Sequence, residues 1–136
     1  MEYPGYGVYK KIKGKTGNSA ITPSCKQIEE DAECVYDFLL ANIKNIQEKD
    51  IILLGRSMGS GACFHLWNER NPQLMLLISP FSSIKRVFSD KLFFLGNFIP
   101  DIYFDNLKKK THKTKDKKIL LIHGCKDLMI KSSHSK

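Results

Sequence analysis

The residue with the clearest capacity for chemistry is Ser57, which lies between two glycines in Gly55-Arg56-Ser57-Met58-Gly59. The pentapeptide follows a short apolar run and precedes a segment of helical character. It fits G-x-S-x-G, the nucleophile elbow, in which small residues two positions away on each side relieve the crowding around a strained serine. Amides at the start of the next helix, including that of Met58, can stabilise a developing oxyanion. The pattern predicts a nucleophilic serine in a strand-to-helix turn.

A serine is an effective nucleophile only when a base takes its proton, and that base is normally a histidine held by a carboxylate. Asp127 is the candidate carboxylate, because it comes just beyond the apolar run Ile119–Ile122 and follows Ser57 in the chain. This matches the order Ser, Asp, His of the hydrolases that carry such a serine turn. The alternative role of Asp127 is to cap a turn.

The histidine base is harder to place. His65 falls in the helix expected after Ser57 and should point away from it. His112 lies in a lysine-rich segment, and His123 ends a strand, where a buried, hydrogen-bonded role is expected. His134 follows Asp127 by only seven residues, which leaves no room for the helix and strand needed between acid and base. The sequence therefore disfavours all four as the base.

Two phosphate-binding motifs fail on inspection. A phosphate loop requires G-x-x-x-x-G-K-[ST]. Gly14-Lys15-Thr16 matches its last three positions, but Tyr9 stands where the first glycine belongs. The dinucleotide fingerprint G-x-G-x-x-G fails as well, because Gly59 and Gly61 are followed by Phe64.

Three short apolar runs must position these residues: Ile51–Leu54, Leu74–Ile78 and Ile119–Ile122. None alternates polar with apolar residues, and strands that are apolar on both faces are typical of parallel sheets covered by helices on each side. A helix over Ser60 to Glu69 fits between the first two runs. The expected fold class is α/β, a parallel sheet with flanking helices and right-handed crossovers.

The segments around these strands carry weaker signals. Ser24 and Gln27 match a capping box, and apolar residues recurring at three- and four-residue steps predict a helix from about Cys25 to Ile43. Residues 1–23 are turn-rich. Residues 81–106 hold many large apolar groups, which indicate a short helix or two at the sheet edge. Core packing is the favoured role of those groups, and lining a substrate pocket is the alternative.

Composition limits the class of protein. The chain has 136 residues, with 42% hydrophobic and 26% charged, values typical of one globular domain. Seven lysines in Lys108–Lys118 account for most of the net charge of +8. This Lys-rich loop, residues 107–118, lacks the arginines and aromatics of nucleic-acid readers, so no nucleic-acid partner is expected. A solvated connection is favoured for it, with a weak membrane-surface contact as the alternative.

The cysteines and the start of the chain bear on compartment. Cys25, Cys34, Cys63 and Cys125 are widely spaced without a C-x-x-C pair, so we expect reduced thiols, simply packed in the core, and no metal site. No secretory signal or membrane-spanning run is evident. A cytoplasmic location is expected, peripheral to a membrane in the alternative. The predicted chemistry needs no cofactor, and no obligate oligomer is indicated.

Four segments, residues 2–7, 55–61, 78–83 and 122–127, together resemble the α/β-hydrolase superfamily. More narrowly they are similar to its BEM46-like branch and its domain-17 group, which includes lipid-thioester hydrolases acting on palmitoylated proteins. The resemblance implies a serine esterase or thioesterase with a small-molecule or lipid-acyl substrate. It implies that Ser57 is the nucleophile, that the Met58 amide helps form the oxyanion hole, and that Asp127 is the triad acid.

The chain also departs from that family. A full member begins with earlier strands and a His-Gly loop, and it ends with a helix and a strand leading to the catalytic histidine. His134 matches a histidine that this branch has soon after the acid and that is not the base. We therefore expect residues 1–136 to form a single incomplete domain, truncated and inactive by itself. The alternative is a catalytically inactive hydrolase-like fragment or a binding protein without the triad histidine.

Overall fold

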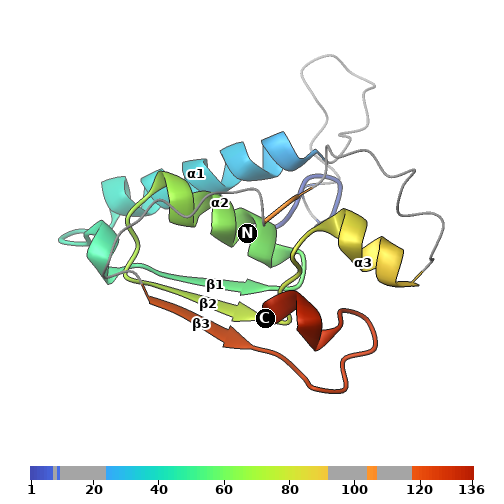
Figure 1. The fold of residues 1–136 in the computed structure, drawn as a ribbon. Coiled ribbons are helices and arrows are strands. Elements are labelled where there is room, and N and C mark those ends of the chain that lie inside the picture. Colours follow the sequence, from blue (N-terminus) through green and yellow to red (C-terminus); the bar gives the residue numbers. More distant parts are fainter. Residues whose placement is uncertain (8, 10–23, 92–103, 107–117) are drawn as a thin grey trace, which may run out of the picture.

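The computed structural model describes residues 1–7, 9, 24–91, 104–106 and 118–136, and these form an α/β fold (Figure 1). The elements in chain order are α1 (Cys25–Asn42), the 3-10 helix η2 (Glu48–Asp50), β1 (Ile52–Arg56), α2 (Gly59–Glu69), β2 (Leu74–Ile78), α3 (Ile84–Lys91), β3 (Lys118–Ile122) and the 3-10 helix η4 (Ser132–Ser135). The strands form a parallel sheet in the order β1-β2-β3. The predicted fold class is confirmed.

Pairing with β2 sets the ends of the outer strands. β2 has the bounds that its apolar run predicted, whereas β1 continues past Leu54 to Arg56, which pairs with Ile78. β3 likewise begins at Lys118, which pairs with Leu74. Hydrogen bonding to a central strand therefore extends both neighbours beyond their apolar runs. The end of the Lys-rich loop enters the sheet, and residues 107–117 of that loop lie outside the described part.

Helix α1 begins as predicted but with half of the expected cap. The Gln27 N–H donates to Ser24 Oγ at 3.1 Å. The Gln27 side chain instead donates to Asp31 Oδ1 at 3.0 Å, so the reciprocal bond of a capping box is not made. The helix ends at Asn42, where Ile43 turns extended and its N–H bonds Leu39 O. None of the helices within the described ranges has both the length and the apolar character needed to cross a bilayer.

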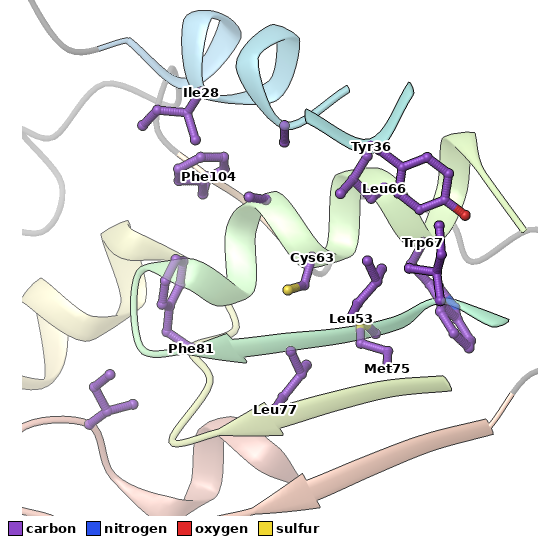
Figure 2. Close-up of a cluster of buried hydrophobic side chains, with 14 residues drawn as sticks. Ile28, Tyr36, Leu53, Cys63, Leu66, Trp67, Met75, Leu77, Phe81 and Phe104 are labelled. Atoms are coloured by element: carbon purple, nitrogen blue, oxygen red, sulfur yellow. The ribbon is translucent and has the colours of Figure 1, made fainter. Parts of the chain in front are cut away.

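The core lies between the sheet and the two helices α1 and α2, which cover the same face (Figures 1 and 2). Leu53, Met75 and Leu77 project from the strands toward α2, and Met75 and Leu77 are fully buried. Burying each such side chain contributes about 1.5–3 kcal/mol. Helix α2 contacts β1 and β2 directly, and α1 packs on α2. This packing fixes the start of α2 relative to the end of β1.

The opposite face of the sheet is apolar and exposed within the described part of the chain. Leu54 is 66% exposed and Ile122 is 49% exposed. The sequence predicted helices on each side of the sheet, but α1 and α2 both lie on one side, as Figure 1 shows.

The segment after β2 contains one short helix, α3, which confirms the prediction of a short helix there. Phe81 and Phe104 are buried, so the core role predicted for this segment is confirmed for these two residues. Phe88 remains 46% exposed on α3. Residues 92–103, which include the other large apolar groups of the segment, lie outside the described part.

All four cysteines are free thiols, as expected. Only Cys63 lies in the core, where burial raises its pKa to about 11 and keeps the thiol protonated. The core position expected for the others is wrong for Cys34 and Cys125, which are exposed. Cys34 lies on the outward side of α1, and Cys125 lies in the turn after β3.

Gly61 should be essential for packing α2 against Phe104, because a Cβ at Gly61 would lie 2.6 Å from the buried Phe104 ring. We predict that Gly61→Ala lowers the free energy of unfolding by about 1–3 kcal/mol, although alanine is the better helix former. Gly59→Ala is the matched control, since its Cβ would meet nothing within 4 Å. Urea denaturation of both variants tests this, and equal stabilities would contradict it.

Candidate active site

The serine turn, residues 55–59, connects β1 to α2 and holds Ser57 in a strained conformation. Ser57 has φ 49°, in the left-handed region that residues with a side chain rarely adopt. Its N–H donates to Ile78 O of the neighbouring strand at 3.0 Å. Ser57 is partly exposed as a residue, and its hydroxyl makes no hydrogen bond to any other described residue. The serine is therefore presented at the carboxyl end of β1 with its side chain uncommitted.

The two glycines of the serine turn differ in what surrounds them. A Cβ on Gly55 would lie 2.7 Å from Cys63 Sγ and 2.9 Å from Gly59 O, so a larger residue would push α2 away from β1. This agrees with the crowding predicted before the serine. The crowding predicted after the serine is wrong, because a Cβ on Gly59 would face open space.

The Met58 amide, directly after Ser57 at the start of α2, is free within the described part of the chain. Met58 has helical backbone angles, and its N–H has no acceptor among the residues that the structure describes. By contrast, the Ser60 N–H donates to Ser57 O at 2.9 Å and the Gly61 N–H to Met58 O at 3.1 Å. An unpaired N–H adjacent to the serine is the arrangement that oxyanion stabilisation needs.

Asp127 lies in the turn after β3 and is an ionised acceptor. Its Oδ1 accepts the N–H groups of Met129 at 2.8 Å and Ile130 at 3.0 Å. The amides of Ile130 and Met129, followed by the Ser79 hydroxyl, hold the pKa of this carboxyl below its ordinary value. The alternative role of Asp127, capping a turn, is thus present in the structure. The second oxygen, Oδ2, is free of these backbone bonds.

Ser57 and Asp127 lie at the same edge of the sheet. Both follow the carboxyl ends of parallel strands, β1 and β3, with β2 between them. Since neighbouring strands are about 4.8 Å apart, β1 and β3 are separated by roughly 10 Å.

None of the three described histidines bonds Ser57. His65 Nε2 lies 2.6 Å from Glu33 Oε1 on α1, so this side chain points away from Ser57, as predicted. His123 donates from Nε2 to Ile130 O at 2.8 Å and bonds Ser135 through Nδ1, which confirms its buried structural role. Its Nε2 lies 3.7 Å from Asp127 Oδ2. His112 lies outside the described part.

His134 belongs to a separate buried cluster. Its Nδ1 accepts the Ser82 N–H at 3.2 Å and lies 2.8 Å from Ser82 Oγ. Because that N–H can only donate, the ring proton is on Nε2, which lies 3.1 Å from Asp90 Oδ2. Ser82 is 5% exposed, so its hydroxyl is closed to a substrate. The cluster holds η4 against α3 and against the loop after β2. Because His134 is bonded within this cluster, it does not act as the base for Ser57.

Two serines and one tyrosine near the serine turn were not predicted from the sequence. Ser79 repeats the geometry of Ser57 at the end of β2, with φ 45° and its N–H on Ile122 O at 2.8 Å. Ser60 Oγ donates to Ser57 O at 2.7 Å, and Tyr3 donates to Met58 O at 2.9 Å. The Ser-Pro pair after the second apolar run was a signal for Ser79, whereas no local spacing indicates Tyr3, which is 55 residues from Met58.

An apolar hollow adjoins the serine turn. It has a volume of about 340 Å³ and is lined by Met1, Tyr3, Tyr6, Met58 and Gly59. A second hollow of about 370 Å³ shares Met1, Tyr3 and Gly59 and extends along β1 beneath α1. Within the described ranges, no group of histidine, cysteine and carboxylate side chains could hold a metal ion.

Comparison with known proteins adds no relative: no family model matches the chain, and no curated protein or solved structure is significantly similar to it.

The pKa of Asp127 provides a direct test of its environment. Because the pKa of Asp127 is lower in the folded state than its ordinary value of 3.8, the charged carboxylate stabilises the fold at pH values above 3.8. This stabilisation is lost as the pH falls through the pKa of the folded state. We therefore predict that the Asp127 carboxyl, followed by carbon-13 NMR, titrates with a midpoint below 3.8. The stability difference between wild type and Asp127→Asn should shrink as pH is lowered through that midpoint. A midpoint at or above 3.8 would contradict the hydrogen bonding described.

Proposed function

We propose that this protein is a serine hydrolase that cleaves ester or thioester bonds. The observation that carries the proposal is the left-handed Ser57 between β1 and α2, with an uncommitted hydroxyl and a free Met58 N–H next to it. A strained serine at such a turn persists only when its surroundings hold it, and such strain concentrates at functional sites. The resemblance of residues 55–61 and 122–127 to α/β-hydrolases supports the same conclusion.

The proposed reaction proceeds through an acyl-enzyme. Ser57 Oγ attacks the carbonyl carbon of the substrate while a base takes the hydroxyl proton. The Met58 N–H donates to the carbonyl oxygen as it becomes negative. Collapse of this intermediate breaks the bond to the alcohol or thiol, which leaves with the proton. Water then attacks the acyl group, the proton passes through the base, and Ser57 is regenerated with release of the acid.

Asp127 is proposed as the carboxylate that orients the base. It lies on the same sheet edge as Ser57, and its pKa is lowered, so it is charged at neutral pH. A charged carboxylate stabilises the imidazolium that forms when a histidine accepts the serine proton. The proposal assigns Ser57, Met58 and Asp127 and leaves the base unassigned.

The substrate is proposed to carry an apolar acyl group, either in a small ester or on a lipid-modified molecule. The support is the hollow beside Met58 and Gly59, whose lining is mostly apolar and includes Met1 and Tyr6. Clefts with apolar walls and a few polar groups are typical ligand sites. We also infer a reducing, cytoplasmic compartment, since Cys34 and Cys125 are exposed free thiols.

The second candidate is a binding protein with a hydrolase-like site and no turnover. The observation in its favour is that His65, His123 and His134 all have other hydrogen-bond partners. Loss of the base typically lowers the rate by several orders of magnitude, while binding and oxyanion contacts remain.

Labelling with a fluorophosphonate probe distinguishes the two candidates. We predict that, with imidazole in the buffer to supply the missing base, the probe adds one phosphonyl group to the chain, that Ser57→Ala abolishes the addition, and that Ser133→Ala, at an exposed serine, does not. Intact-mass spectrometry and peptide mapping measure the adduct. Imidazole in the buffer should accelerate labelling if no histidine reaches Ser57, because it supplies the missing base.

The contradicting result is equally specific. A wild-type chain that unfolds cooperatively yet remains unlabelled at Ser57, with and without imidazole, would reject the hydrolase and leave the binding protein. Labelling that survives in Ser57→Ala would reject the assignment of the nucleophile.

A further inference from the structure

Met58, whose N–H is proposed to hold the oxyanion, lies between two peptide groups, and each of these has a side-chain hydroxyl bonded to its carbonyl oxygen. The first peptide joins Ser57 to Met58, and the second joins Met58 to Gly59. Ser60 Oγ donates to Ser57 O at 2.7 Å, and the Tyr3 hydroxyl donates to Met58 O at 2.9 Å. Neither tyrosine nor serine has been given a role in the proposed chemistry.

Ser60 controls the direction of the Met58 N–H through the first peptide. In a trans peptide the C=O and N–H point in opposite directions. Ser57 O accepts two bonds from Ser60, one from its N–H at 2.9 Å and one from its hydroxyl. These bonds hold the carbonyl toward the first turn of α2, so the Met58 N–H is directed away from the helix. Ser60 is fully buried, and its hydroxyl is therefore shielded from competition with water.

Tyr3 holds the second peptide from a distant part of the chain. Met58 O accepts the Gly61 N–H and the Tyr3 hydroxyl together. Burial of Tyr3, followed by the nearby Cys63 and Cys25, raises its pKa to about 12, so the hydroxyl keeps its proton and remains a donor. Tyr3 also lines both hollows beside the serine turn.

We propose that Ser60 and Tyr3 are positioning residues, two hydroxyls that fix the peptides on either side of Met58 and thereby set the direction of the oxyanion-binding N–H. This inference rests on the proposed function, because it takes the Met58 N–H as the donor to the oxyanion. It adds that a side chain near the N-terminus helps to form a site otherwise built from β1 and α2.

Two variants remove these hydroxyls with matched controls. Tyr3→Phe keeps the ring and removes one donor, and Tyr9→Phe removes a tyrosine hydroxyl that instead bonds Asp31 Oδ1 at 3.2 Å. Ser60→Ala removes the other donor, and Ser89→Ala removes a serine hydroxyl that bonds the backbone oxygen of Lys85 at 3.0 Å on α3. Each control loses the same kind of hydrogen bond at a place remote from Met58.

The first measurement is the rate of fluorophosphonate labelling at saturating and subsaturating probe. Tyr3→Phe and Ser60→Ala should each lower the maximal labelling rate about fivefold, the equivalent of about one net hydrogen bond. The probe concentration giving half the maximal rate should not change, because Tyr3→Phe keeps the ring that lines the hollow and Ser60 is fully buried. Tyr9→Phe and Ser89→Ala should label like the wild type.

The second measurement is amide hydrogen exchange by NMR, which needs no activity. Exchange of the Ser60 and Gly61 amides should accelerate in Tyr3→Phe and Ser60→Ala, since their acceptors are less firmly held, and stay unchanged in the controls. Unchanged exchange in folded variants would overturn the proposal. Faster exchange with an unchanged labelling rate would also overturn it, because the hydroxyls would then hold the turn without affecting the oxyanion.

If the wild-type chain is not labelled at all, the proposed hydrolase activity is rejected, but the hydrogen bonding of Ser60 and Tyr3 to the two peptides is not. The exchange data would then decide whether Ser60 and Tyr3 hold the two peptides, and the loss of the oxyanion role would follow from the labelling alone.

Discussion

The left-handed backbone of Ser57 is the constraint on which the site depends. Its φ of 49° costs free energy that the surrounding structure must offset. Parallel pairing supplies one restraint through the bond from the Ser57 N–H to Ile78 O. The packing of α2 on β1 supplies a second restraint. It depends on Gly55, because a larger residue at this position would collide with Cys63 and Gly59. The strained serine is thus a consequence of how closely the helix approaches the strand.

The parallel sheet brings the remaining groups to the same edge. All three strands point their carboxyl ends in one direction, so the segments that follow them meet there (Figure 1). Ser79 repeats the left-handed bend at the end of β2, and its hydroxyl contributes to holding Asp127 ionised beyond β3. An edge that carries a strained serine, a charged carboxylate and an unpaired amide is organised for polar chemistry.

Local pattern in the sequence was enough to predict much of this arrangement. Continuous apolar runs predicted parallel strands, and the bounds of β2 agree because it is the central strand, fixed on both sides. The serine turn was predicted because its small residues and flanking elements are adjacent in sequence. The predicted crowding at Gly59, the full capping box at Ser24 and the core position of Cys34 were wrong, since each depended on which neighbours the folded chain supplies.

Contacts between distant residues could not be predicted. Tyr3 reaches Met58 across 55 residues, and the Ser82–His134–Asp90 cluster joins three separate segments. Nothing in the local spacing of these residues indicates such partners. The same reason explains why the base stays unassigned, because its position would depend on how a distant segment returns to the carboxyl edge of the sheet.

The most direct test of the account is the backbone of Ser57, determined from a crystal structure or from NMR couplings of the chain. We predict a positive φ near 49°, with Oγ accessible to solvent and Asp127 beyond β3 on the same sheet edge. A Ser57 with negative, helical φ inside α2, or an Asp127 at the opposite end of the sheet, would contradict it.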